Sequence, residues 1–274
     1  MLSGGLMGEA LTPVKLLAHR LSGGAKLSRA EIEALESLTG PPRRFAKGKP
    51  LVTQGATDDY VWLTSSGWAF RQKSLLDGRR QIVAFILPGE LTEKGPQMPF
   101  GAPDTILAAT EDFQAVPIGR ARLLDLMKTY PRIQQGLYYE ELTRHAVTRE
   151  WMAVLGVRNA EERFAYLIYE VFARLNAMGL AAGNTFDVPI SQTDLGDTLG
   201  MSTVHLNRTL QKLRAGGLVT WTGHSVHLPD PARLASFAEF STGFQREAER
   251  FASAAVTAVS GTPDQSVSLP PRRH

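Results

Sequence analysis

Residues 190–228 constrain the fold of this chain more than any other stretch. Serine is a favoured N-cap, and Ser191 predicts the start of a short helix from Gln192 to Leu199. Gly200 then provides a left-handed turn, and Ser202 caps a second helix that ends near residue 213. Leucines recur at helical spacing on the inward faces of both helices, at Leu195, Leu199, Leu206, Leu210 and Leu213. The stretch therefore predicts two short helices joined by a tight turn.

Two short strands are predicted directly after these helices, at residues 218–221 and 225–228. They flank Thr222-Gly223-His224, which is a turn of the right size for a small hairpin. Gly196 is small at the place where the two helices must cross closely. Helices, turn and hairpin together have the spacing of a winged helix-turn-helix.

The same register leaves one face of the second helix pointing outward. This face carries Thr203, Val204, Asn207, Arg208 and Gln211. In this motif the outward face enters the major groove of DNA, and helix N-termini contact phosphates. Residues at the helix termini and at the margin of the face would position the DNA backbone, namely Ser191, Gln192, Thr193, Ser202 and His205. The alternative is a small helical bundle whose polar face is only solvated.

The composition sets broader limits. A chain of 274 residues with 43% hydrophobic residues is long enough for two packed cores. No apolar run approaches the roughly 20 residues that cross a bilayer, and no basic segment leads into an apolar core at the start. We therefore expect no membrane association and a cytoplasmic location. The absence of cysteine excludes disulfides, thiol catalysis, cysteine-ligated zinc and cysteine-held iron–sulfur clusters.

The N-terminal half changes from helix to strand patterns. Residues 1–27 are expected to form an extension with a disordered tip and a short helix that Thr12-Pro13 opens and Leu21 ends. Ser28 and Glu31 form a capping box for a helix that continues to Leu38. Short strands and glycine turns then follow up to residue 117, with a hairpin signal at Asp77-Gly78. These signals predict an antiparallel β-roll at residues 28–130 and an α+β fold class.

A long helix is predicted at residues 131–157, about 40 Å in length. One stripe of this helix could form a seam between two copies of the chain, and it contains Tyr138, Leu142, His145, Arg149, Met152 and Leu155. Packing of the stripe against the roll of the same chain is the alternative. Gly156 interrupts the pattern, and Asn159 with Glu162 signals a new helix. The winged domain would therefore span residues 158–240, and a tail at 241–274 would hold one amphipathic stretch at 245–259.

A β-roll with Asp77-Gly78-Arg79 and Pro88-Gly89-Glu90, a long helix and this helix-turn-helix resemble the Crp/Fnr superfamily of bacterial transcription regulators. The segment LNRTLQKLRAGGLV, residues 206–219, is similar to the recognition helix of that family and its continuation. The resemblance covers about residues 28–240. It implies a sensor roll of the cyclic-nucleotide-binding type and a homodimer formed by the long helix. It also implies palindromic double-stranded DNA and RNA polymerase as partners. No enzymatic activity is expected.

The roll departs from the nucleotide-binding pattern of the family. Members that bind cAMP follow a Gly-Glu with an Arg-Ser or Arg-Thr some ten residues later, since a cyclic phosphate needs a guanidinium with further donors. Gly89-Glu90 could be the ribose-side element or simply a turn with a surface acid, which we favour. Asp104 precedes Thr105 where the arginine is expected, and a carboxylate repels phosphate. We therefore expect no response to cAMP, and the sequence identifies no cofactor or effector.

Other chemistry can be weighed from the histidines. No histidine lies between His19 and His145, so the roll cannot supply an imidazole metal site of the cupin type. His224 and His227 could hold a metal on the wing, although surface or phosphate-facing roles are favoured. His145 could ligate haem, but a seam residue is the favoured interpretation. The opposing function is a protein-interaction or effector-storage module, yet the planar donors of Arg208 favour contact with base edges.

Overall fold

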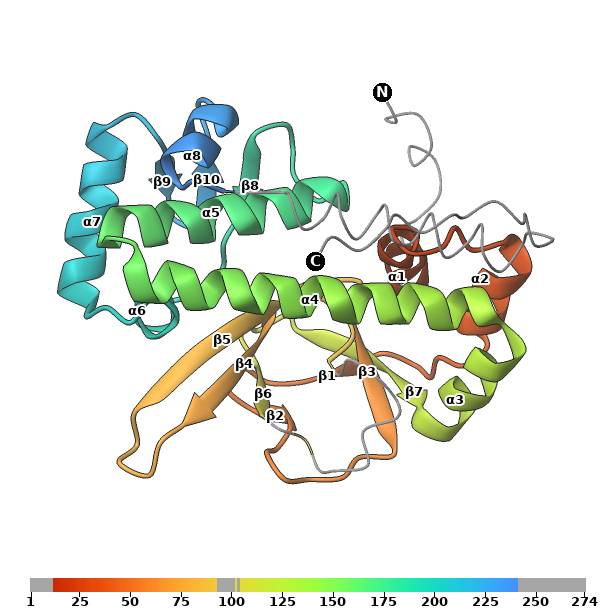
Figure 1. The fold of residues 1–274 in the computed structure, drawn as a ribbon. Helices are drawn as coiled ribbons and strands as arrows, with labels where there is room; N and C mark the ends of the chain where they lie inside the picture. Colours follow the sequence, from red (N-terminus) through yellow and green to blue (C-terminus); the bar gives the residue numbers. More distant parts are fainter. Residues whose placement is uncertain (1–11, 93–101, 103, 241–274) are drawn as a thin grey trace, which may run out of the picture.

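The computed structural model describes residues 12–92, 102 and 104–240, and Figure 1 shows their arrangement. The tip of the N-terminal extension and the amphipathic stretch at residues 245–259 lie outside the described residues. Two antiparallel sheets form the first half of the chain, a long helix lies across them, and a smaller helical domain with its own three-stranded sheet follows. The α+β class with an N-terminal roll and a C-terminal helix-turn-helix is thereby confirmed.

The roll is built from two sheets. One sheet has the order β1-β7-β3, with β1 at Arg43–Arg44, β7 at Gln114–Gly119 and β3 at Tyr60–Ser66. The other has the order β2-β6-β4-β5, whose strands span Pro50–Val52, Thr105–Ala108, Ala69–Ser74 and Arg80–Ile86. All neighbouring strands in both sheets are antiparallel.

Glycine turns connect these strands in two different ways. Gly78, at φ +85°, closes the hairpin of β4 and β5 at the predicted Asp77-Gly78 position. Gly67, at φ +66°, separates β3 from β4, but these two strands do not pair with each other. The turn at Gly67 instead carries the chain from one sheet to the other.

The first two helices begin at their predicted caps. Helix α1, Pro13–Leu21, is capped by Thr12, and α2, Arg29–Glu36, has the capping box of Ser28 with Glu31. Helix α1 packs against α4, and its buried face joins the hydrophobic core through Val14, Leu17, Ala18 and Leu21. Residues 13–21, which belong to the predicted N-terminal extension, therefore contribute an apolar stripe to the packed core.

Helix α3, Arg120–Thr129, leads into α4, Pro131–Val157, which runs along the roll and reaches the C-terminal domain (Figure 1). Gly156 lies within the last turn of α4, one residue before its end. Asn159 then caps α5, Ala160–Ala177, in the predicted capping box with Glu162. The apolar face of α5 is buried in the core of the C-terminal domain.

The remaining elements form the C-terminal domain. In chain order they are β8 (Thr185–Asp187), α6 (Gln192–Leu199), α7 (Thr203–Ala215), β9 (Thr220–Thr222), β10 (Ser225–His227) and α8 (Pro231–Phe237). One continuous buried cluster joins this domain to the roll, because Trp68 and Phe85 of the roll belong to the same cluster as Phe164 and Leu199. No helix among the described residues is long and apolar enough to cross a membrane.

Candidate nucleic-acid interface and buried charge cluster

Helices α6 and α7 form the predicted helix-turn-helix. The Ser191 hydroxyl accepts a hydrogen bond from the Asp194 amide at 3.1 Å, and the Ser202 hydroxyl accepts one from His205 at 3.3 Å. Gly200 adopts the left-handed conformation between the helices, at φ +65°. A Cβ at Gly196 would lie 2.6 Å from the carbonyl oxygen of Met201, so the close approach of the turn requires glycine there.

The outward face of α7 is open to solvent. Thr203, Val204, Arg208 and Gln211 are exposed, and Val204 retains 63% of its accessible surface. Within the described part of the chain, the Arg208 guanidinium has no hydrogen-bond or ion-pair partner. Its five donors are therefore free to bind an external acceptor.

Asn207 differs from its neighbours on this face because it is half-buried. Its side-chain nitrogen donates to the Gln192 side-chain oxygen at 2.9 Å and to the Thr203 carbonyl at 3.0 Å. These bonds connect α7 to the start of α6. Asn207 thus fixes the Gln192 side chain and keeps only its own oxygen for other contacts.

The predicted backbone-contacting residues are all exposed to solvent. They are Ser191, Gln192, Thr193, Ser202 and His205. In the wing, Gly223, at φ +60°, closes the hairpin of β9 and β10, and β8 extends it to the sheet order β8-β10-β9. The Arg214 guanidinium donates to the Trp221 carbonyl, which ties this wing to the end of α7.

The wing histidines do not form a metal site with their described neighbours. His224 and His227 are exposed, and Nδ1 of His227 lies 3.0 Å from the Thr185 hydroxyl. Among the residues that the structure describes, no group of three or more potential ligands is arranged to hold a metal ion.

Ion pairs and a hydrogen bond connect the roll to α6, the first helix of the motif. The Arg80 guanidinium on β5 pairs with Asp194 and, at 2.7 Å, with Asp197, both on α6. The Gln81 amide donates to the Thr198 carbonyl at 2.8 Å. The orientation of the helix-turn-helix is therefore tied to the hairpin of β4 and β5.

The residues of the predicted seam on α4 are all exposed. Tyr138 is 62% exposed and Met152 71% exposed, and Leu142 and Leu155 are exposed as well. His145 and Arg149 lie on the same exposed stripe, with Nε2 of His145 3.6 Å from Glu141. Among the described residues, these side chains therefore leave exposed apolar surface along the helix.

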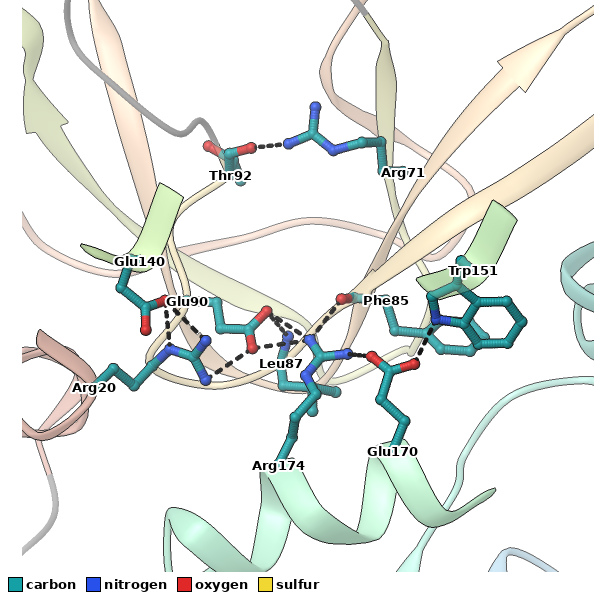
Figure 2. A network of polar contacts seen from close by, with 10 residues as sticks. All are labelled: Arg20, Arg71, Phe85, Leu87, Glu90, Thr92, Glu140, Trp151, Glu170 and Arg174. Carbon is teal, nitrogen blue, oxygen red and sulfur yellow. Dashed lines mark hydrogen bonds and ion pairs between the residues drawn. The ribbon is translucent and has the colours of Figure 1, made fainter. Parts of the chain in front are cut away.

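Asp104 is buried in the roll between two cations. Its carboxylate pairs with Arg71 at 3.1 Å and with Lys73 at 2.7 Å, and Arg71 also donates to the Thr92 carbonyl (Figure 2). The Asp104 carboxylate, which stands where the sequence pattern of cAMP-binding members has an arginine, therefore neutralises the two cations nearest to it.

Glu90 is not the surface acid that we favoured, because only 2% of its side chain is exposed. Arg174 donates to both of its oxygens at 2.8 Å, and Arg20 pairs with it at 2.9 Å (Figure 2). The turn predicted at Gly89 is confirmed, because Gly89 has a φ of +82°. The turn aims the carboxylate inward, where the two arginines compensate its charge.

Ion pairs connect Glu90 to a buried charge cluster, which also includes Arg144 through its electrostatic interactions with Glu90 and Glu140. The cluster consists of Arg20, Glu90, Glu140, Arg144, Glu170 and Arg174. Arg20 pairs with Glu140 at 2.9 Å, and Arg174 pairs with Glu170 at 3.1 Å. The Trp151 indole donates to Glu170 at 2.7 Å (Figure 2). The cluster therefore joins α1, the roll, α4 and α5.

The electrostatics of the cluster favour its ionised form. Burial alone would raise the pKa of Glu90, but Arg174, Arg20 and Arg144 outweigh it and lower the pKa to about 2. Burial lowers the pKa of Arg144 to about 10 against the attraction of Glu90. Sequence reasoning missed Arg20 and Arg174, because Arg174 lies 84 residues from Glu90 and no local pattern connects them.

The two halves of the chain each match a protein-family model. Residues 42–130 match the cyclic nucleotide-binding domain, and residues 162–237 match the Crp-like helix-turn-helix domain. The transcriptional activator protein FnrL of Cereibacter sphaeroides is 28% identical over 214 residues, which cover 77% of this chain and 85% of FnrL. The nitrogen fixation regulation protein FixK of Bradyrhizobium diazoefficiens is 29% identical over 217 residues, covering 78% and 88% of the two chains.

The solved structure of FixK2 from Bradyrhizobium japonicum has the same fold. It superimposes with a TM-score of 0.64 at 24% identity and covers 72% of this chain and 96% of FixK2. The chain belongs to the Crp/Fnr superfamily of DNA-binding transcription regulators.

Proposed function

We propose that the protein acts as a homodimer that binds a palindromic DNA site and regulates transcription there, with RNA polymerase as its further partner. The observation that carries this proposal is the open face of α7, where Arg208 has no partner among the described residues. One recognition helix covers only a few base pairs, so two related helices reading symmetric half-sites about one helical turn apart supply the specificity.

The exposed stripe on α4 supports the dimer. Tyr138, Leu142, Met152 and Leu155 place apolar surface on one side of the helix, and all four are exposed in the described part of the chain. A second copy of the stripe, related by a two-fold axis, would bury these side chains. His145 and Arg149 lie in the same seam and would border it.

The residues of the helix pair divide into two roles. Arg208, Val204, Thr203 and Gln211 face the base edges, and Asn207 presents its oxygen beside them while it holds Gln192. Ser191, Gln192, Thr193, Ser202 and His205 contact the phosphates on either side. The protein does not respond to cAMP, because Asp104 stands where a phosphate-binding arginine is expected and Arg71 is already paired with it.

Recovery of genomic fragments bound by the purified protein, followed by binding measurements on the enriched site, tests the proposal. Arg208 should donate two hydrogen bonds to a guanine, so Arg208→Ala should cost about 1–3 kcal/mol at that base pair and relax the preference there. Arg29→Ala on α2 is the matched control, since Arg29 is 93% exposed and lies outside the helix-turn-helix.

Two outcomes would contradict the proposal. Equal loss of affinity for all sequences would make Arg208 a phosphate contact. A DNA affinity that does not fall with added salt would argue against DNA binding altogether and favour a protein-binding role, because phosphate contacts release counterions.

A further inference from the structure

Glu90 is held in place by the backbone around it. The Thr64 amide donates to the Glu90 carbonyl at 2.9 Å, and the Gly89 amide donates to the Thr64 carbonyl at 2.9 Å. Helix α1 closes over this turn, because a Cβ at Gly89 would lie 2.6 Å from Cβ of Leu16. The carboxylate is therefore a rigid anionic point on the roll.

Arg174 brings the C-terminal domain to this point. It lies on α5, donates to both Glu90 oxygens and also to the Phe85 carbonyl at 2.8 Å, so three of its contacts reach the roll. Glu170, one turn earlier on α5, holds the other side of the guanidinium at 3.1 Å. The orientation of Arg174 is thereby fixed from its own helix.

Helix α5 in turn carries the recognition helix. It packs against both α6 and α7, and Phe164 of α5 shares the buried core with Leu206 of α7. Arg163 donates to the Leu199 carbonyl at 3.2 Å, and Glu161 pairs with Lys212 of α7. A displacement of α5 relative to the roll would therefore move α7 with it.

The arrangement fixed in this way leaves the recognition surface accessible. Arg208 and Val204 are exposed while Arg174 and Glu90 are paired, and the second contact of the roll, through Arg80, reaches the inner side of α6. No exogenous ligand is needed to complete the contact, because both charges come from the chain itself.

We propose that Arg174 is a positioning residue for DNA binding. By pairing with Glu90 it holds the C-terminal domain against the roll in the orientation in which α7 binds DNA. This inference rests on the proposed function, and it assigns to the chain itself a connection between roll and DNA-binding domain that does not depend on a bound effector.

Binding of wild type and variants to the enriched DNA site, without added small molecules, tests this assignment. Arg174→Met should weaken binding to that site about tenfold or more, since the apparent affinity falls with the fraction of correctly oriented protein. Binding to random DNA should change less than about twofold, because the phosphate-contacting residues are untouched. Arg174→Lys keeps the positive charge but has fewer hydrogen-bond donors, so it should recover part of the loss. The matched control Arg29→Met should bind like wild type.

The double variant Glu90→Gln/Arg174→Met supplies the discriminating measurement. If the two residues act through one contact, the double variant should lose no more affinity than the worse single variant. Hydrogen exchange should then show faster exchange in α5 and around Gly89, with α7 itself still protected. If Arg174→Met does not fold, Arg174→Lys and Glu90→Gln decide the same question.

The outcomes separate this inference from the function on which it rests. Wild-type protein that enriches no DNA overturns the function. A second outcome overturns the role of Arg174 alone. In it, wild type binds the DNA site and the Arg208→Ala variant loses specificity, but the Arg174→Met variant binds as tightly as wild type or more tightly. Additive losses in the double variant would also overturn it, because they would show that Glu90 and Arg174 act independently.

Discussion

Val204 occupies an exposed position near the start of α7, where 63% of its surface is accessible. This exposure excludes packing of Val204 between the helices. Valine has no acceptor for a cytosine amino group, whereas its methyl groups can contact the methyl group of thymine. Wild type should therefore favour T or show little preference at the contacted base pair, with discrimination of at most about 1 kcal/mol from methyl burial.

Selection on randomised half-sites with wild type and Val204→Glu measures this preference. The carboxylate of the variant should shift the chosen base toward cytosine, because it can accept from the cytosine amino group. Val204→Ala serves as the control, since it removes methyl groups without adding an acceptor. If wild type and Val204→Glu select the same base, Val204 makes no base contact.

Asp104 carries a prediction about ligands of the roll. The carboxylate is paired with Arg71 and Lys73, so an incoming cyclic phosphate meets a carboxylate and finds these cations already neutralised. Calorimetric titration should show no micromolar binding of cAMP or cGMP, and neither nucleotide should raise the DNA affinity. A parallel titration with the enriched DNA site shows that the protein is active. Micromolar binding of either nucleotide would contradict the prediction.

At the scale of elements, the exposed apolar stripe of α4 is the surface on which we expect the second copy of the chain to pack. Leu142→Arg places a charge in the proposed seam and should convert the dimer into monomers, because the buried charge would have no counterion. Light scattering measures the mass of the protein in solution. The affinity of the monomeric variant for the palindromic site should be lower than that of the dimer. Leu180→Arg, at an exposed leucine after α5, should leave the dimer intact. A wild-type monomer, or a Leu142→Arg dimer, would refute the seam.

Elements with local signals were predictable from sequence, and long-range pairings were not. The caps at Ser28, Asn159, Ser191 and Ser202 each accept a bond from within the next turn, so their effect is visible in a few residues of sequence. The separation of β3 from β4 at Gly67 depends on partners more than 30 residues away in β7 and β6. A glycine turn alone does not distinguish a hairpin from a change of sheet.

The same distinction applies to the candidate site. The residues on α7 follow from helical periodicity, and the structure exposes all of them except Asn207, which is half-buried by its bonds to α6. Glu90 and Arg174 come together only because the roll and the C-terminal domain share one core. The burial of α1 likewise depends on α4, which lies about 110 residues further along the chain.

At the scale of the whole molecule, the buried charge cluster connects acid stability to the packing of roll and C-terminal domain. The ordinary pKa of a glutamate is 4.5, and the arginines around Glu90 lower it to about 2 despite its burial. A depressed carboxylate pKa adds stability that is complete above 4.5 and is lost as the pH falls toward 2. At about 1.4 kcal/mol per pKa unit, the whole shift corresponds to about 3 kcal/mol.

Glu90→Gln should therefore flatten the pH dependence of the free energy of unfolding between pH 4.5 and about 2. The variant can be less stable at neutral pH, since Arg20 and Arg174 lose their shared partner, so the comparison concerns the slope with pH and not the level. Urea unfolding at several pH values measures both quantities. Glu33→Gln, at an exposed glutamate of α2, should keep the wild-type slope. If Glu90→Gln keeps that slope as well, Glu90 does not hold its charge through this pH range, and the cluster does not stabilise the roll against the C-terminal domain in acid.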